Sequence, residues 1–143
     1  MCVRQLAWDD PVCQRLMSMP GIGVVVALTF RAAVDDPARF RSSKRVGPWV
    51  GLTPSRNQSG ERDISGGITK AGDVNLRREL CQAATVMMNR GRSTWLRTWG
   101  AQLAQRRGRK IAMVALARRI AVILHRIWMD GTTFQPHAAP RVA

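Results

Sequence analysis

The segment that most constrains the fold is the apolar stretch IAMVALARRIAVILHRIWM at residues 111–129. It is long enough to cross a membrane as a helix, but it contains Arg118, Arg119 and Arg126. Each arginine near the centre of a bilayer costs roughly 2.5 to 3.5 kcal/mol, which argues against a membrane span. At about 100° per residue, these arginines and His125 occupy roughly a third of the helical circumference, and the remainder can face a core. We therefore predict a helix of a soluble protein.

The rest of the chain fits around such a helix as one domain, about residues 1–130. A chain of 143 residues can bury roughly two thirds of its unfolded surface, so disulfides are not required. Cys2, Cys13 and Cys81 are odd in number and match neither a zinc-ligand spacing nor a disulfide framework. We interpret them as reduced thiols, with Cys81 in a helix core. No segment resembles a signal peptide, so we expect a cytoplasmic location.

Apolar residues recur at helical spacing along most of the chain, which predicts a mainly α fold. In the segment VNLRRELCQAATVMMNR, Leu76, Leu80, Ala83 and Met87 fall on one face of a helix. The predicted elements are a helical pair at about 11–34, short helical turns between 36 and 51, a basic loop at 51–72, and a bundle of three longer helices at 73–129.

Capping residues support several of these boundaries. The Asp-Pro pairs at 10–11 and 36–37 each place a capping side chain before a proline at the first helical position. Ser42 or Ser43 is expected to cap the next short turn. Short strands at 24–26 and at one or two places near 46–70 are an alternative, and we expect a disordered tail at 131–143.

Charge is the strongest compositional signal. The chain has 23 Lys and Arg against 9 Asp and Glu, a net charge of +14, and all but three of the bases are arginine. The guanidinium group suits phosphate, and so large an excess of positive charge is self-repelling unless a polyanion compensates it. Nucleic acid is therefore the leading partner and an acidic membrane surface the second. A genome that prefers arginine codons explains the choice of arginine but not the shortage of acids.

The segment LMSMPGIGVVVALTF at 16–30 reads as a helix, a tight turn and a second helix, and resembles the helix-hairpin-helix module. The glycines let the backbone turn without obstruction, so amides around Gly21, Ile22 and Gly23 can face a DNA phosphate with the helix dipole behind them. Such contacts position a protein on a duplex without reading its sequence. The competing interpretation is an ordinary helical hairpin with a glycine cap. We favour DNA binding, since PGIG is contiguous and the chain is basic.

The loop at 51–72 has no apolar periodicity but is rich in Gly, Ser and Arg. Long loops of this kind are typically functional or disordered. A serine hydroxyl among cations suits attack on a phosphodiester, because the cations stabilise the developing negative charge and ease deprotonation. Most such loops only bind the phosphate backbone, and spacing alone does not select one serine. The expected phosphate-contacting residues are Arg56, Arg62, Gly66, Gly67 and Lys70, with Arg77 and Arg78 at the next helix start, where a solvated helix face is the alternative.

The motifs PGIG, DPARF, GLTP, SG, GGITKAG and LRREL.QAA follow one another between about residues 19 and 84. In this order and spacing they resemble the carboxy-terminal half of transposases of the insertion-sequence 110 family, the bridge-RNA-guided recombinases. The resemblance implies an enzyme in which an amino-terminal RuvC-like domain supplies metal-binding carboxylates. It also implies that a serine in this half becomes covalently joined to DNA during strand exchange.

The serine before the glycine that follows GLTP is Ser59, so the resemblance places the nucleophile there, with Ser55 and Ser65 as alternatives. Family members commonly have a serine doublet at this point, whereas this chain has Gln58 before Ser59. Trp49 also stands where a tyrosine is usual.

The nine acids are scattered, and we interpret the Asp pairs at 9–10 and 35–36 as helix caps, not metal ligands. We therefore expect no metal site or cofactor in this chain, and magnesium only together with a RuvC-like domain. This makes the chain look like a truncated, separately encoded or remnant copy that lacks the full active site.

The expected partners are DNA, a structured guide RNA, and either further copies of the chain or a RuvC-like domain. The alternative function is a non-catalytic helix-hairpin-helix module that binds DNA or RNA. A ribosomal-type RNA-binding protein would explain the charge but not the ordered motifs.

Overall fold

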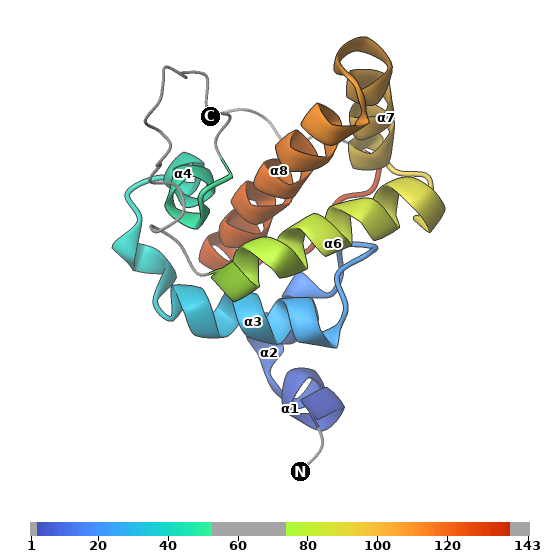
Figure 1. The fold of residues 1–143 in the computed structure, drawn as a ribbon. Coiled ribbons are helices and arrows are strands. Elements are labelled where there is room, and N and C mark those ends of the chain that lie inside the picture. Colours follow the sequence, from blue (N-terminus) through green and yellow to red (C-terminus); the bar gives the residue numbers. More distant parts are fainter. Residues whose placement is uncertain (1–2, 53–73, 138–143) are drawn as a thin grey trace.

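The computed structural model describes residues 3–52 and 74–137, and its regular elements in those ranges are all helical (Figure 1). The mainly α prediction is confirmed. The elements are α1 (Val3–Asp9), α2 (Pro11–Leu16), α3 (Val24–Val34), the 3-10 turns η1 (Pro37–Arg39) and η2 (Ser43–Arg45), α4 (Val46–Val50), α6 (Val74–Arg90), α7 (Trp95–Arg107) and α8 (Arg109–Asp130). The alternative of strands is wrong at 24–26 and 46–50, which lie in α3 and α4. Residues 53–70 of that alternative lie outside the described ranges.

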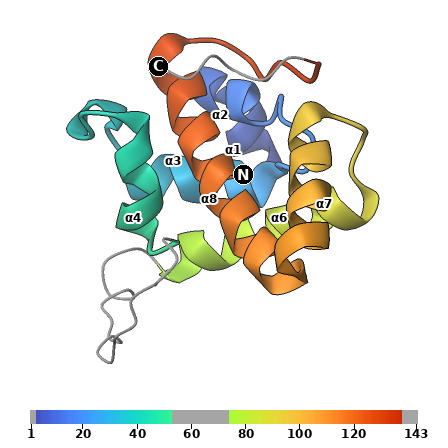
Figure 2. The ribbon, with the colours of Figure 1, turned by 90° about the horizontal axis from the view of Figure 1, so that it is seen from above.

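Helix α8 lies at the centre of the molecule, and α2, α4, α6 and α7 all pack on it (Figure 2). Leu116, Ile120 and Leu124 are fully buried along its length, as the apolar periodicity predicts. The helix ends where Gly131 adopts a left-handed conformation (φ 68°) and its N–H donates to the Ile127 carbonyl. None of the described helices has the length and apolar character needed to cross a membrane.

The third of the helical circumference that was predicted to be polar in α8 is covered by other segments of the chain. The His125 ring is 1% exposed. The stem of Arg118 packs against Gly47 of α4, where an added Cβ would lie 2.6 Å from the Arg118 Cγ. The Arg119 guanidinium lies over the rings of Trp95 and Trp99, 5.7 and 4.6 Å from their centroids. Long arginine stems and flat guanidinium groups pack well on apolar and aromatic surfaces, so these side chains join α8 to its neighbours.

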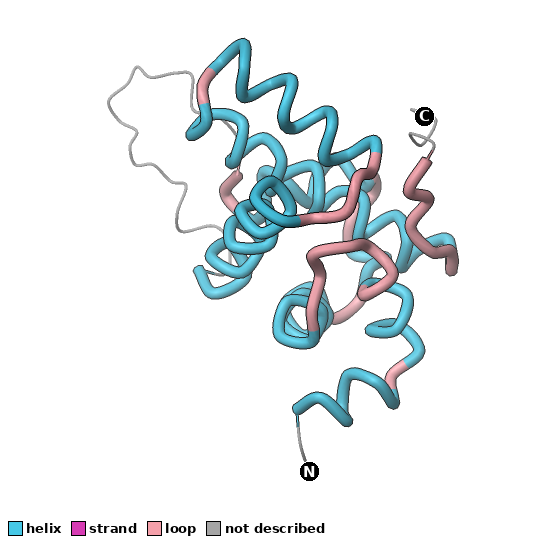
Figure 3. Tube along the Cα trace, turned by 90° about the vertical axis from the view of Figure 1, so that its right-hand side faces the viewer, coloured by secondary structure: helices cyan, strands magenta, loops and turns pink. Residues whose placement is uncertain are grey.

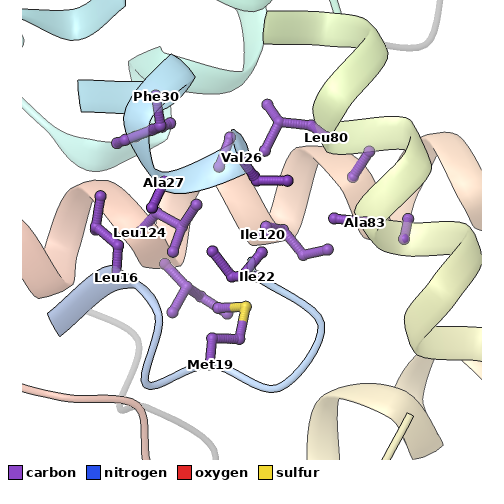
Figure 4. Packing of buried hydrophobic residues seen from close by; sticks show 14 of the residues in the cluster. Leu16, Met19, Ile22, Val26, Ala27, Phe30, Leu80, Ala83, Ile120 and Leu124 are labelled. Carbon is purple, nitrogen blue, oxygen red and sulfur yellow. The ribbon is translucent and has the colours of Figure 1, made fainter. Parts of the chain in front are cut away.

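The helical pair α2 and α3, with the turn at 17–23 between them, packs on α6 and α8. Figure 4 shows one continuous apolar cluster at this contact, to which the pair contributes Leu16, Met19, Ile22, Val26, Ala27 and Phe30, α6 contributes Leu80 and Ala83, and α8 contributes Ile120 and Leu124. The turn is therefore held by buried side chains on both sides of Gly21.

Capping residues act as predicted at three places. The carboxylates of Asp10 and Asp36 accept N–H groups at the starts of α2 and η1, and the Ser42 hydroxyl does the same for η2. Helix α1 was not anticipated, because its sequence shows no clear apolar period and its Val3, Leu6 and Trp8 are about half exposed. It lies at the amino-terminal end of the described chain, beside α2 (Figure 3).

Asp10 also ties α2 to α3. Its carboxylate caps α2 by accepting the Val12 N–H (3.0 Å), accepts the Cys13 thiol (3.5 Å), and forms an ion pair with Arg31 of α3. Burial, the nearby Asp10 charge and the hydrogen bond to it raise the pKa of the Cys13 thiol from 9.0 to about 11. Cys13 is therefore a buried thiol that keeps its proton at neutral pH, consistent with its interpretation as a reduced, non-catalytic cysteine.

The expectation of a disordered tail is wrong for residues 131–137. Phe134 is 7% exposed and stacks on Trp95, with 6.2 Å between the ring centroids. Its N–H donates to the Ser18 hydroxyl (2.8 Å), and Trp95 donates its indole N–H to the Gln135 carbonyl (2.9 Å). One buried aromatic side chain and these hydrogen bonds fasten the segment across the turn at 17–23 and the start of α7. Residues 138–143 lie outside the described ranges.

Replacing Phe134 by Ala is expected to lower the free energy of unfolding by about 3 kcal/mol, because it removes a buried ring and leaves a gap beside Trp95. Urea unfolding followed by circular dichroism measures the change. Gln135→Ala is the matched control and should cost less than about 0.5 kcal/mol, since it keeps the main-chain carbonyl that binds Trp95 and loses only a long, exposed hydrogen bond to the Thr133 carbonyl (3.4 Å). Equal effects of the two substitutions would show that the segment does not pack on the fold.

Cys13 is expected to react slowly with iodoacetamide at neutral pH, because its raised pKa leaves little thiolate. Its labelling should accelerate as the pH approaches 11, and the unfolded protein should be labelled at lower pH. Since the folded state keeps this proton between about pH 9 and 11 while the unfolded state loses it, stability should fall as pH rises through that window. Peptide mass spectrometry with and without urea measures the labelling, and equal rates in both would contradict the assignment.

Candidate nucleic-acid interface

The turn PGIG joins α2 to α3 with one residue in a left-handed conformation. Gly21 has φ 96°, which side chains disfavour, and a Cβ there would lie 3.7 Å from the Ala83 carbonyl oxygen and the Met87 Cβ of α6. The Ile22 side chain is buried, and its N–H donates to the Met19 carbonyl (3.1 Å). Of the three predicted contact residues in this turn, Gly21 therefore lies against α6 and Ile22 is buried in the core.

Gly23 leaves the start of α3 open. It has extended backbone angles, is exposed, and a Cβ built on it would meet no atom within 4 Å. No side chain caps α3, and its first turn carries no acidic residue. The first backbone N–H groups of an α-helix have no partner within the helix, and the helix dipole makes this end positive. The geometry thus presents backbone donors where an anion can approach.

The two arginines predicted at the start of α6 differ in their surroundings. Arg77 is partly buried and donates from Nη1 to the Val50 carbonyl (3.1 Å), the last residue of α4. Arg78 is exposed, and its Nη2 donates to the Asn75 Oδ1 (2.7 Å). Arg77 therefore joins the ends of α4 and α6, whereas Arg78 keeps its charge at the surface.

The remaining predicted site residues are in the segment between α4 and α6. They lie outside the described residues, and their positions stay predictions: Ser55, Arg56, Ser59, Arg62, Ser65, Gly66, Gly67 and Lys70. Helix α4, which precedes that segment, contacts α6, which follows it.

Sequence reasoning missed a hydrogen-bonded group around His125. Nε2 lies 2.8 Å from the Pro37 carbonyl oxygen and Nδ1 lies 2.7 Å from the Ser43 hydroxyl. Because a carbonyl only accepts, Nε2 donates the bond to Pro37. The Ser43 hydroxyl can accept from or donate to Nδ1, according to the tautomer. The ring of Phe40 meets the imidazole edge to face at 5.5 Å. The only signal in the sequence was that His125 is a polar residue in an apolar helix. In the structure, His125 fixes η1 and η2 on α8.

The described part of the chain contains no cluster of side chains of the kind that holds a metal ion. Within residues 3–52 and 74–137, no three His, Cys, Asp or Glu side chains come close enough together to hold a metal ion. Cys81 is half-buried in α6, and burial raises its pKa although Arg77 opposes this. We derive no metal-dependent step from these residues, and the expectation of magnesium concerns a separate RuvC-like domain.

Known proteins resemble most of this chain. It is 35% identical over 139 residues to the transposase of insertion sequence element IS1111A from Coxiella burnetii, an alignment that covers 93% of this chain and 37% of the relative. It is 35% identical over 128 residues to the IS1328 transposase of Yersinia enterocolitica, covering 88% and 38%. It is 28% identical over 134 residues to a 43.6 kDa protein of insertion element IS110 from Streptomyces coelicolor, covering 93% and 33%.

The chain thus spans a little over a third of the length of the first of these relatives. The family model of the IS116/IS110/IS902 transposases matches residues 13–99, which include the turn at 17–23, α4 and α6. The resemblance inferred from the ordered motifs is confirmed: this chain belongs to the IS116/IS110/IS902 family of transposases.

Proposed function

We propose that this chain is the portion of a transposase that holds DNA by its phosphates and carries the serine nucleophile of strand exchange, Ser59. The family match carries the proposal, because residues 13–99 contain the PGIG turn and the serine loop together. The net charge of +14 supports a polyanionic partner. The chain spans about a third of the length of its relatives. We propose that complete transposition also uses a RuvC-like domain, a structured guide RNA and several subunits.

The DNA-holding element is the helix-hairpin-helix formed by α2, the PGIG turn and α3. The uncapped start of α3 offers backbone N–H groups, and Gly23 leaves room for a phosphate to reach them. Gly21 and Ile22 act by fixing this turn against α6, so the donors are already oriented before DNA arrives. A contact of this kind positions the protein on any duplex and reads no bases.

The chemical step belongs to the loop between α4 and α6. The Ser59 hydroxyl attacks a DNA phosphorus, a Ser59 oxygen–phosphorus bond forms, and the ester bond to the sugar oxygen breaks. The proton lost by the hydroxyl is balanced by the proton that the leaving sugar oxygen gains. Arg56 and Arg62 stabilise the negative charge that develops on the phosphoryl oxygens, and the exposed Arg78 adds to the field. Arg77 is less suited to this role, because one guanidinium nitrogen is bonded to the Val50 carbonyl.

A non-catalytic DNA- or RNA-binding module is the second candidate. The observations that favour it are the net charge of +14 and the uncapped start of α3, since both serve phosphate binding without any chemical step. Both candidates require the hairpin to bind phosphate, and they differ in whether a covalent intermediate forms.

Gly23→Asp is expected to weaken binding to duplex DNA by on the order of tenfold, because it places a carboxylate where the phosphate would lie. Gly23→Asn is the matched control, since both residues cap helices well and suit the Gly23 backbone angles, but Asn is neutral. Fluorescence anisotropy with a labelled duplex measures affinity. If Asp and Asn weaken binding equally, the start of α3 is not the phosphate site.

Ser59→Ala is expected to abolish a covalent adduct between protein and DNA. The adduct would be trapped on denaturing gels after the chain is mixed with DNA, a guide RNA and the RuvC-like domain of a family member. Ser55→Ala and Ser65→Ala are the matched controls and should retain it. An adduct that persists in Ser59→Ala moves the nucleophile to another serine, and its absence in the unsubstituted chain favours the non-catalytic module.

A further inference from the structure

A second group of cations lies where α6 ends and where α7 passes into α8. These residues, which we name the basic corner, are all exposed: Arg90, Arg92, Arg106, Arg107, Arg109 and Lys110. The Arg109 Nη2 donates to the Asn89 Oδ1 (2.7 Å), which brings the start of α8 to the end of α6. Arg97 of α7 donates to the Met87 and Met88 carbonyls and so holds α7 on the same end of α6. The residues of the corner therefore lie together in the fold, although the bonded pair Asn89 and Arg109 is twenty positions apart in sequence.

The charges at this corner are not arranged for stability. Arg106 and Arg107 end α7, where cations complement the helix dipole. Arg109 and Lys110, however, begin α8, where the dipole repels cations and where no acidic residue or side-chain cap is present in the first turn. None of the six corner cations forms an ion pair with a residue in 3–52 or 74–137. A polyanion is the partner that would relieve this repulsion.

The basic corner is continuous with the hairpin. Gly21 packs against Met87 in the last turn of α6, and the exposed Arg90 and Arg92 follow within five residues of it. A cavity of about 350 Å³ lies between the turn and the connection from α6 to α7. Ser18 and Pro20 of the turn line it together with Arg92 and Ser93. Figure 1 shows the start of α3, the end of α6 and α7 on the same side of the molecule, the right-hand side in that view. An extended anion held at Gly23 can therefore continue toward the corner cations.

We propose that the basic corner is a second phosphate-binding surface, which continues along the same DNA duplex that the hairpin holds. The identity of the ligand as DNA rests on the proposed function. Three observations support the corner as a binding surface. Its six cations are exposed, and two of them stand at the start of α8, where the helix dipole disfavours positive charge. The cavity lined by Arg92 also extends to the turn. Its contacts would add affinity and fix the direction in which the duplex leaves the hairpin, without reading sequence.

The test compares two triple variants of the whole chain that lose equal charge. The corner variant is Arg106→Gln, Arg107→Gln and Lys110→Gln, and spares Arg109 because it bonds Asn89. The control variant is Arg41→Gln, Lys44→Gln and Arg45→Gln, three exposed cations beside α4, on the opposite side of α8 from α7 (Figure 2). Affinity for a labelled duplex is measured by anisotropy over a range of salt concentrations.

Each phosphate contact on B-DNA contributes about 0.9 to the slope of log affinity against log salt, so the corner variant should lower that slope by about two to three. The control should lower it by less than one. Equal slopes in the two variants would overturn the proposal, because general loss of charge would then explain the effect. Weaker binding of a structured RNA with an unchanged duplex slope would also overturn it.

A charge reversal at Lys110 separates function from folding. Lys110→Glu places an acid in the first turn of α8, so thermal unfolding should move to higher temperature while duplex binding weakens. A variant that is neither stabilised nor weakened in binding would contradict the charge argument. If Gly23→Asp leaves duplex binding unchanged while the corner variant lowers the salt slope, the hairpin contact is wrong and the corner proposal stands. If Gly23→Asp weakens binding and the corner variant leaves the slope unchanged, only the corner proposal is wrong.

Discussion

The burial of α8 is the constraint on which the rest of the structure depends. Leu116, Ile120 and Leu124 lie at its fully buried centre, and α2, α4, α6 and α7 each pack on a different part of its circumference. Such a helix has little free surface for its polar residues. Arg118, Arg119 and His125 are accommodated by packing on a glycine, stacking on tryptophans, and hydrogen bonding to Pro37 and Ser43. The central helix therefore uses its polar side chains to orient its neighbours.

This arrangement matters for the proposed phosphate site, because backbone donors bind an anion well only when they are preorganised. The PGIG turn has no charged side chain of its own, and its donors are useful only if α3 starts in a fixed direction. Several independent contacts supply that rigidity: the apolar cluster of Figure 4, the Asp10 to Arg31 ion pair, the packing of Gly21 on α6, and the segment around Phe134, which donates to the Ser18 hydroxyl and accepts from Trp95 of α7. The last of these joins the turn to α7, and so to the cations at the α7 to α8 connection.

Much of the fold was predictable from local patterns. The caps at Asp10, Asp36 and Ser42 follow from side chains acting on backbone within a few residues, which is information that a single sequence contains. Three features that the sequence did not predict have a common cause. The tail at 131–137, the burial of His125 and the structural use of Arg77 each depend on a partner far away in the chain, namely Ser18, Pro37 and Val50. Periodicity and composition carry no record of such partners.

The sequence by itself determined that this is a mainly helical, strongly basic chain of the IS116/IS110/IS902 family, because charge, helical period and ordered motifs are properties of the residues alone. It also pointed to Ser59 and to the loop at 51–72, on which the described residues add nothing. Only the tertiary structure decided which cations serve the fold and which face solvent. Arg77, Arg97 and Arg119 are held by carbonyls and rings, whereas Arg109 and Lys110 stand at the surface beside the end of α6. The reason is that a guanidinium group has the same charge in either setting, and its surroundings are set by packing between helices distant in sequence.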